Sequence, residues 1–277
     1  RLGRRLLDQE GRFMRFLEKA GRLNRAIEYL PDDDQLAERK AAGSALTTPE
    51  RAVLLAYCKM WLFDEILGSE LPEDPWIATA LQRYFPATLR ERMAAYIPRH
   101  PLQREIIATH VLNSMVNRVG ATFTHRIAEM SGARPPQVVR AYLLTREVFG
   151  LVELWQQVET LDNRVPDALQ AEMLIDEGWL TSRATTWFLR SRRLNEPMAP
   201  TIARLAPAVA RLAARLAPAA SKSARAVQWM AQGVPAELAT RIASAEGLLD
   251  ALDIAEVAES TARDFDAVCE VHAGIGE

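Results

Sequence analysis

The sequence predicts an all-α protein, an irregular multi-helix bundle with a second, smaller helical unit. Apolar residues recur at spacings of three and four along most of the 277 residues. No segment alternates with a period of two between turn residues, as a half-buried strand would. Hydrophobic residues make up 49% and charged residues 25%, so a chain of this size can bury a core without disulfides or metals. This composition excludes a disordered chain, a collagen-like chain and a small disulfide scaffold.

The N-terminal elements follow from this periodicity and from helix start and stop signals. An amphipathic run over 6–30 predicts a helical segment that stops at a proline. A second helix is expected over 48–67, with Thr48 as its cap and a glycine directly after its last residue. Asp74 and the next residue, a proline, repeat the start signal, and a further segment is expected over 86–97.

The longest uninterrupted apolar pattern covers 102–130 and predicts one long helix with a wide apolar face. A Ser-Gly pair ends it. Further helices are then expected over 135–149, over 151–161 and, after a turn, over 167–193.

A change of composition near residue 195 predicts a domain boundary. The segment 197–220 is rich in Ala, Leu, Arg and Pro, and its prolines at 207 and 218 are expected to kink or end helices. We therefore expect a helical domain over 1–195 and a smaller Ala-rich helical unit over 196–277, truncated at its C-terminal end.

Charge is segregated around this boundary, although the net charge is only −2. The stretch 183–225 contains nine basic residues and one acid, Glu196, whereas 237–277 contains ten acids and two bases. The basic stretch could contact the phosphates of a nucleic acid. Few aromatic residues accompany it, so solvated helix faces or pairing with the acidic stretch is the favoured interpretation.

The cysteines and the ends of the chain indicate a cellular context. Cys58 and Cys269 are far apart and outside any CxxC spacing, so we expect two buried thiols in a reducing, cytoplasmic compartment. No apolar run is long enough to span a bilayer, and no membrane partner is expected. The first residue is Arg and the last segment resembles an interrupted helix, which suggests a piece of a longer polypeptide. The six tryptophans are all expected in the core.

Motifs for catalysis, cofactors and metals are missing from the sequence. There is no P-loop, no GxSxG elbow, no HExxH and no complete dinucleotide fingerprint. His110 and His125 lie about 22 Å apart along the predicted long helix, too far to share a metal. The carboxylates of 32–34 are interpreted as helix-capping groups rather than as metal ligands. We therefore assign no catalytic, cofactor-binding or metal-ligating residue.

Polar residues beside the apolar face of the predicted 102–130 helix form the one candidate site. His110, Asn113, Asn117 and Thr124 fall near one stripe. Buried amides need hydrogen-bond partners, so the stripe fits an interhelical network, contact with a neighbouring domain or, least, an active-site contribution. We take Asn113, Asn117 and Arg118 as candidate domain-interface residues.

Several long motifs, in order, resemble the C-terminal part of the large bacterial NAD-specific glutamate dehydrogenases over about 1–195. The resemblance thins beyond that range and returns near 252–258. The motifs are LNRAIEYLP at 23–31, LTTPERAVLLAY at 46–57, REIIAT at 104–109, MVNRVG at 115–120, REVFG at 146–150 and LDNRVP at 161–166.

The resemblance implies a parent enzyme that converts L-glutamate, NAD and water to 2-oxoglutarate, ammonia and NADH. It also implies that the dinucleotide fold and the amino-acid site lie upstream, so the parent uses NAD and this fragment holds no cofactor. The expected partners are the catalytic domain of the same chain and, in a homo-oligomer, other copies. We expect bracing of the catalytic domain, subunit assembly or both, and an isolated fragment that is inactive.

Two other function classes stay open at this stage. One is a free-standing helical protein-interaction module with no link to glutamate. The other is a nucleic-acid-binding helical protein that uses 183–225, whose binding would weaken steeply with salt.

Overall fold

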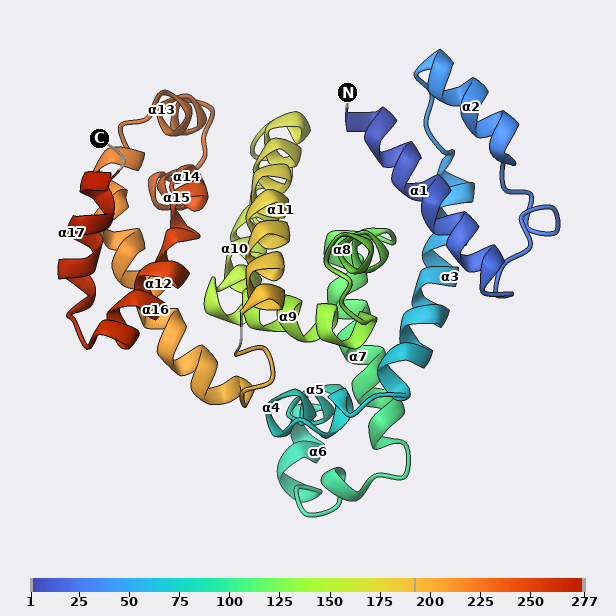
Figure 1. Cartoon of the computed structure of the whole chain (residues 1–277), viewed down its shortest axis with the longest axis horizontal. Coiled ribbons are helices and arrows are strands. Elements are labelled where there is room, and N and C mark those ends of the chain that lie inside the picture. The colour runs from blue at the N-terminus through green and yellow to red at the C-terminus, as the bar shows by residue number, and fades with distance from the viewer. Residues whose placement is uncertain (1, 192, 276–277) are drawn as a thin grey trace. The chain divides into compact units, whose positions relative to one another are not determined.

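The computed structural model describes residues 2–191 and 193–275, and all regular elements in this part of the chain are helices (Figure 1). The all-α prediction is confirmed. Contacts divide the chain into two compact units, Arg1–Arg140 and Ala141–Glu277. The expected domain boundary at residue 195 stays a prediction. Within the described residues, no helix is long and apolar enough to cross a membrane.

Unit 1 contains ten helical elements in the described residues, and the helix α9 continues from it into unit 2. The elements are α1 (Leu2–Lys19), α2 (Asp33–Ala42), α3 (Thr48–Leu67), η1 (Leu71–Glu73), α4 (Pro75–Ala78), α5 (Ala80–Tyr84), α6 (Ala87–Arg92), η2 (Ile97–Arg99), α7 (Gln103–Val119), α8 (Phe123–Ser131) and α9 (Pro135–Val148).

The core of unit 1 forms where α3 packs along α7 and where α1 crosses α3. Leu62 and Met115 are fully buried between these helices. Phe13 of α1 is also fully buried, and its ring lies 5.5 Å from that of Trp61. Each such aromatic side chain removes a large apolar area from water, so this corner holds α1, α3 and α7 together.

Unit 2 holds the remaining helices, and α12 is its centre, packing against α14, α15 and α16. Leu205 of α12 and Trp229 of α13 are each 1% exposed. The elements are α10 (Leu151–Glu159), α11 (Asp167–Arg190), α12 (Met198–Ala220), α13 (Ala224–Ala231), α14 (Ala236–Ala243), α15 (Ala245–Leu248), α16 (Asp250–Thr261) and α17 (Phe265–Ile275).

Of the two expected effects of the prolines in 197–220, ending a helix is wrong, because α12 runs through both Pro207 and Pro218. A kink at these prolines stays a prediction. A proline removes one backbone hydrogen bond, which costs a helix about 3 kcal/mol. Buried side chains such as Leu205 and Leu212 offset this cost by fixing α12 in the core.

The predicted helical run over 6–30 is too long, because α1 ends at Lys19. Gly21 adopts a positive φ of 68°, which glycine tolerates, and closes the helix end. The amide of Arg22 then donates to the carbonyl of Leu17 at 2.9 Å. After this, the Asn24 side chain accepts from the backbone and forms a turn.

The predicted long helix over 102–130 is also wrong, since it is two helices, α7 and α8, separated at Gly120. Gly120 has φ 81° and ψ 172°, a conformation that residues with a Cβ avoid. The apolar period continues across this break because both helices bury a face in unit 1. Periodicity alone therefore could not place the interruption.

Helix α3 begins as predicted, but its cap is Thr47 rather than Thr48. The backbone amide of Thr47 donates to the Glu50 carboxylate at 2.7 Å, and the Glu50 amide donates to the Thr47 hydroxyl at 3.4 Å. This reciprocal pair is a capping box. Arg39 adds two hydrogen bonds to Glu50, and together these bonds lower the pKa of Glu50 to about 2.

Candidate functional site

The candidate interface residues lie on α7, near its C-terminal end. Asn113 is half-buried, whereas Asn117 and Arg118 are exposed. Thr124 is 1% exposed on the next helix, so the predicted stripe does not continue along one helix. The interface role of Asn113, Asn117 and Arg118 stays a prediction, and the exposure of the last two leaves them accessible to another surface.

The two histidines assigned to one long helix lie on α7 and α8 instead. His125 packs against Phe16, with ring centroids 4.7 Å apart, and burial lowers the pKa of His125. Its surroundings are those of a core side chain. Among the described residues, no group of three or more His, Cys, Asp or Glu side chains could hold a metal ion.

The carboxylates of 32–34 cap a helix, as predicted. The amide of Gln35 donates to Asp32 at 2.8 Å, and the Asp32 amide donates to the Gln35 side chain at 3.0 Å. Asp33 pairs with Arg25 at 2.9 Å and with Arg15 at 3.0 Å. These bonds account for the first two carboxylates of the run.

Cys58 and Cys269 are free and buried, as predicted. Burial raises the pKa of the Cys58 thiol to about 12, which keeps it protonated and unreactive at neutral pH.

Several arginines of the basic stretch 183–225 pair with the acidic C-terminal stretch, which is one of the two favoured interpretations. Arg193 and Arg204 approach the Glu259 carboxylate at 2.9 and 3.2 Å, and Arg211 approaches Asp266 at 2.5 Å. Arg192, one of the nine basic residues of this stretch, lies outside the described residues. The pairing lowers the positive charge that a nucleic acid could meet here.

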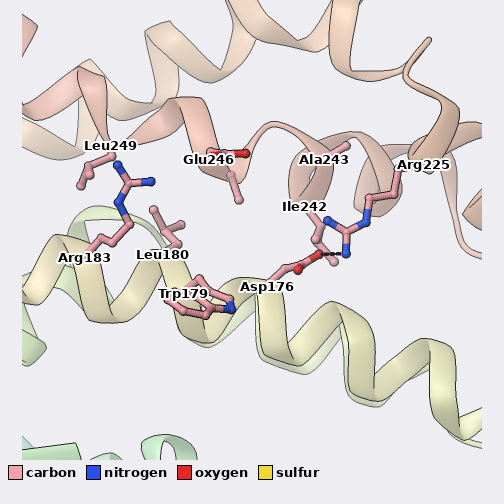
Figure 2. A pocket seen from close by; sticks show the side chains of 10 residues that line it. Asp176, Trp179, Leu180, Arg183, Arg225, Ile242, Ala243, Glu246 and Leu249 are labelled. Carbon is pink, nitrogen blue, oxygen red and sulfur yellow. Dashed lines mark ion pairs between the residues drawn. The ribbon is translucent and has the colours of Figure 1, made fainter. Parts of the chain in front are cut away.

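One cavity of unit 2, of about 270 Å³, lies between α11 and the helices α13 to α15 (Figure 2). Trp179 and Arg183 of α11 line one wall, and Glu246 and Leu249 lie opposite. Trp179 is 56% exposed, so the expectation that every tryptophan is in the core is wrong for this residue. Trp61, Trp155 and Trp229 are buried as expected.

The charges of this cavity are partly neutralised. Asp176 forms an ion pair with Arg225, which also approaches Glu172 at 2.8 Å (Figure 2). The Arg225 guanidinium stacks 4.7 Å from the Trp229 ring, so it is held on both sides. Arg183 and the indole of Trp179 remain as a polar and an apolar contact for a bound group. Sequence reasoning missed this cavity because its walls come from helices about 50 to 70 residues apart.

Comparison with known proteins identifies the family of this helical assembly. The family described as "Glutamate dehydrogenase, C-terminal" matches residues 43–277. The chain belongs to this family. The match includes α3 to α17 and therefore covers the interface candidates, the cavity and the paired charges.

Curated relatives agree with this family. An NAD-specific glutamate dehydrogenase of Halomonas elongata is 36% identical over 98% of this chain, and one of Pseudomonas aeruginosa is 36% identical over 100%. One of Mycobacterium tuberculosis is 35% identical over 84% of the chain. The chain spans only 17%, 17% and 14% of the lengths of these relatives. The matched region is thus a small part of each relative.

Proposed function

We propose that this chain is the C-terminal helical region of an NAD-specific glutamate dehydrogenase, where it braces the catalytic region and contributes to subunit assembly. The observation that carries the proposal is the match of nearly the whole chain to 17% of a relative with that name. The parent would convert L-glutamate, NAD and water to 2-oxoglutarate, ammonia and NADH in the cytoplasm. NAD would bind the parent outside this chain, and the parent would form a homo-oligomer.

A bracing region needs a stable body and an accessible surface. Buried corners such as Phe13 and Trp61 in unit 1 and Leu205 in unit 2 supply stability. Asn117 and Arg118 on α7 supply accessible polar groups that can hydrogen-bond to another surface. Both features suit a structural role beside a catalytic region.

The proposal is tested in the full-length parent enzyme with Asn117→Ala and Arg118→Ala. Two exposed residues outside α7, Asn195→Ala and Arg190→Ala, are the matched controls. We expect the first pair, and not the controls, to lower the melting temperature, the oligomeric mass or the rate of NADH formation. Unchanged values of all three would remove these residues from the proposal.

A second measurement addresses the role of the whole region. The 277-residue chain alone is expected neither to bind NAD nor to turn over glutamate. A parent enzyme that lacks this region should lose activity or assembly. Full activity and native mass without the region would overturn the bracing role.

A further inference from the structure

Residues 82–102 of unit 1, named here the arm, lie mostly at the surface of the unit. The arm includes α6, which has no buried residue, and η2. Ile97, which is 4% exposed, is the one buried side chain of the arm. Fixing each residue of a segment costs about 1–2 kcal/mol of conformational entropy, which burial normally offsets. An ordered segment that buries so little is poised to be covered by another surface.

The arm presents large apolar side chains to solvent in α6 and in the turns that follow it. Leu89, Met93 and Tyr96 follow one another at spacings of four and three, and their exposed fractions are 38%, 45% and 71%. Turns continue past α6, because the amide of Met93 donates to Leu89 at 2.8 Å and that of Tyr96 donates to Met93 at 2.8 Å. This spacing is the one with which a helical segment inserts into the groove of a partner.

The composition of the arm is that of an interface core. It has four arginines, Arg83, Arg90, Arg92 and Arg99, against one acid and no lysine. Arg, Tyr and Met are enriched at interface cores, where Lys and Glu are depleted. Arg90 donates to the carbonyl of Phe85 at 2.8 Å. Within the described residues, none of the four arginines forms an ion pair, so the arm presents a positive surface.

A cavity of about 360 Å³ lies at the base of the arm, bounded by η1, α4, α5, η2 and α7. Its apolar walls include Pro75, Leu81, Ile97 and Ile107. Arg104, which also lines the cavity, fixes this base by donating to the carbonyl of Leu67 at 2.6 Å. An apolar side chain of a partner can therefore enter a preformed cavity beside the exposed face of the arm.

We propose that the arm and this cavity dock onto an acidic surface of the remaining polypeptide of the parent enzyme, one that offers an apolar side chain to the cavity. This inference rests on the proposed function. The four arginines are complementary in charge to an acidic surface, and the cavity can hold an apolar side chain.

The size of the arm favours a partner in the same polypeptide. Stable interfaces between free proteins use about 20–30 residues on each side, and the arm is at the lower limit. A covalent tether raises the effective concentration of the partner to about the millimolar range, so a small surface suffices. Most of the length of the relatives lies outside the matched region, which provides such a partner.

Hydrogen exchange of the arm measures whether it is covered. We expect the amides of 82–102 to exchange at least about tenfold more slowly in the full-length parent than in the 277-residue chain. Equal exchange in both proteins would overturn the proposal. Protection in the 277-residue chain that rises with its concentration would assign the arm to a second copy and would also overturn it.

A pair of variants tests the side chains. Met93→Ser with Tyr96→Ser in the full-length parent should abolish most of this protection, and Arg92→Glu with Arg99→Glu should reduce it. The matched control is Met60→Ser with Met130→Ser, two exposed methionines of unit 1 outside the arm, which are 52% and 67% exposed. Equal loss in the control, or none in either arm variant, would contradict docking through the arm.

These outcomes are separable from those of the proposed function. If the arm exchanges equally in both proteins while deletion of the region abolishes assembly, bracing holds and docking through the arm fails. If deletion of the region leaves activity and mass unchanged, the proposed function fails whatever the arm shows.

Discussion

Two arginine-rich segments of this protein differ in the groups that their arginines contact. In the stretch 183–225, arginines such as Arg204 and Arg211 meet carboxylates of α16 and α17. In the described part of the chain, the arginines of the arm contact backbone carbonyls or solvent and form no ion pair. The sequence draws attention to the first segment because it is longer and more basic. A charged segment marks a partner surface only when the fold leaves its charge uncompensated.

The same two segments also differ in how deeply their apolar side chains are buried. Leu205 in the first is 1% exposed, whereas Leu89 in the arm is 38% exposed. The first segment therefore contributes to the core of unit 2, whereas the arm, apart from Ile97, lies at the surface of unit 1.

The largest expected effect on stability is that of truncating a leucine in 183–225, compared with the same truncation in the arm. Leu205→Ala in the 277-residue chain should lower the free energy of unfolding by about 2–5 kcal/mol, because it opens a cavity in a packed core. Leu89→Ala should lower it by only about 1 kcal/mol, because 38% of Leu89 is already exposed. Denaturant unfolding measures both values. Comparable losses would show that the arm is part of the core.

The next largest effect on stability is expected from Glu50, an acid of unit 1 that is paired with Arg39. Arg39 and the cap of α3 lower the pKa of Glu50 from 4.5 to about 2. Glu50 therefore stabilises the fold above pH 4.5, and this contribution is lost as the pH falls toward about 2. Glu50→Gln should cost about 2 kcal/mol at neutral pH and remove this dependence, since the side chain is largely buried. Urea unfolding between pH 6 and pH 3 measures the free energy of unfolding of the unchanged chain and of the variant.

Glu38 is the control for Glu50, because it is an exposed acid on α2 with no recorded ion pair in the described residues. Glu38→Gln should leave the pH dependence of stability intact. An equal change in the two variants would show that the loss follows from net charge rather than from the contacts of Glu50.

A smaller effect is expected from the ion pairs of unit 2. Glu259 approaches Arg193 and Arg204, but its side chain is 46% exposed, so solvent screens these pairs. Glu259→Gln should lower the free energy of unfolding by less than about 1 kcal/mol, and the difference should shrink as salt rises. Glu270→Gln, at an exposed site on α17, is the matched control. A salt-independent loss would indicate packing rather than charge.

Features encoded locally could be predicted from the sequence, namely the helical class, the start of α3 and the capping by Asp32. The hydrophobic period, the position of prolines and the cap residues act over about one helical turn, so they can be recognised from the sequence alone. The end of α1 and the break at Gly120 were missed because apolar residues continue past both points. Such breaks depend on a glycine that adopts a positive φ, which the apolar pattern does not reveal.

The arm and the cavity beside Trp179 were not predicted, for a different reason. Tyr96 and Trp179 resemble core aromatics in sequence, and their exposure depends on what distant helices leave uncovered. The candidate interface on α7 was predicted from polar residues beside an apolar face. Its polar side chains are partly exposed, as such a role needs, and the interface role stays a prediction.

The smallest effect should come from the arginines of the arm. Arg83→Gln, Arg92→Gln and Arg99→Gln together should change the free energy of unfolding of the 277-residue chain by less than about 0.5 kcal/mol. Because these charges repel one another, low salt should make the change slightly stabilising. Denaturant unfolding at two salt concentrations measures both quantities. A loss above about 1 kcal/mol would mean that the fold itself compensates these arginines, which would place the arm in the same class as 183–225.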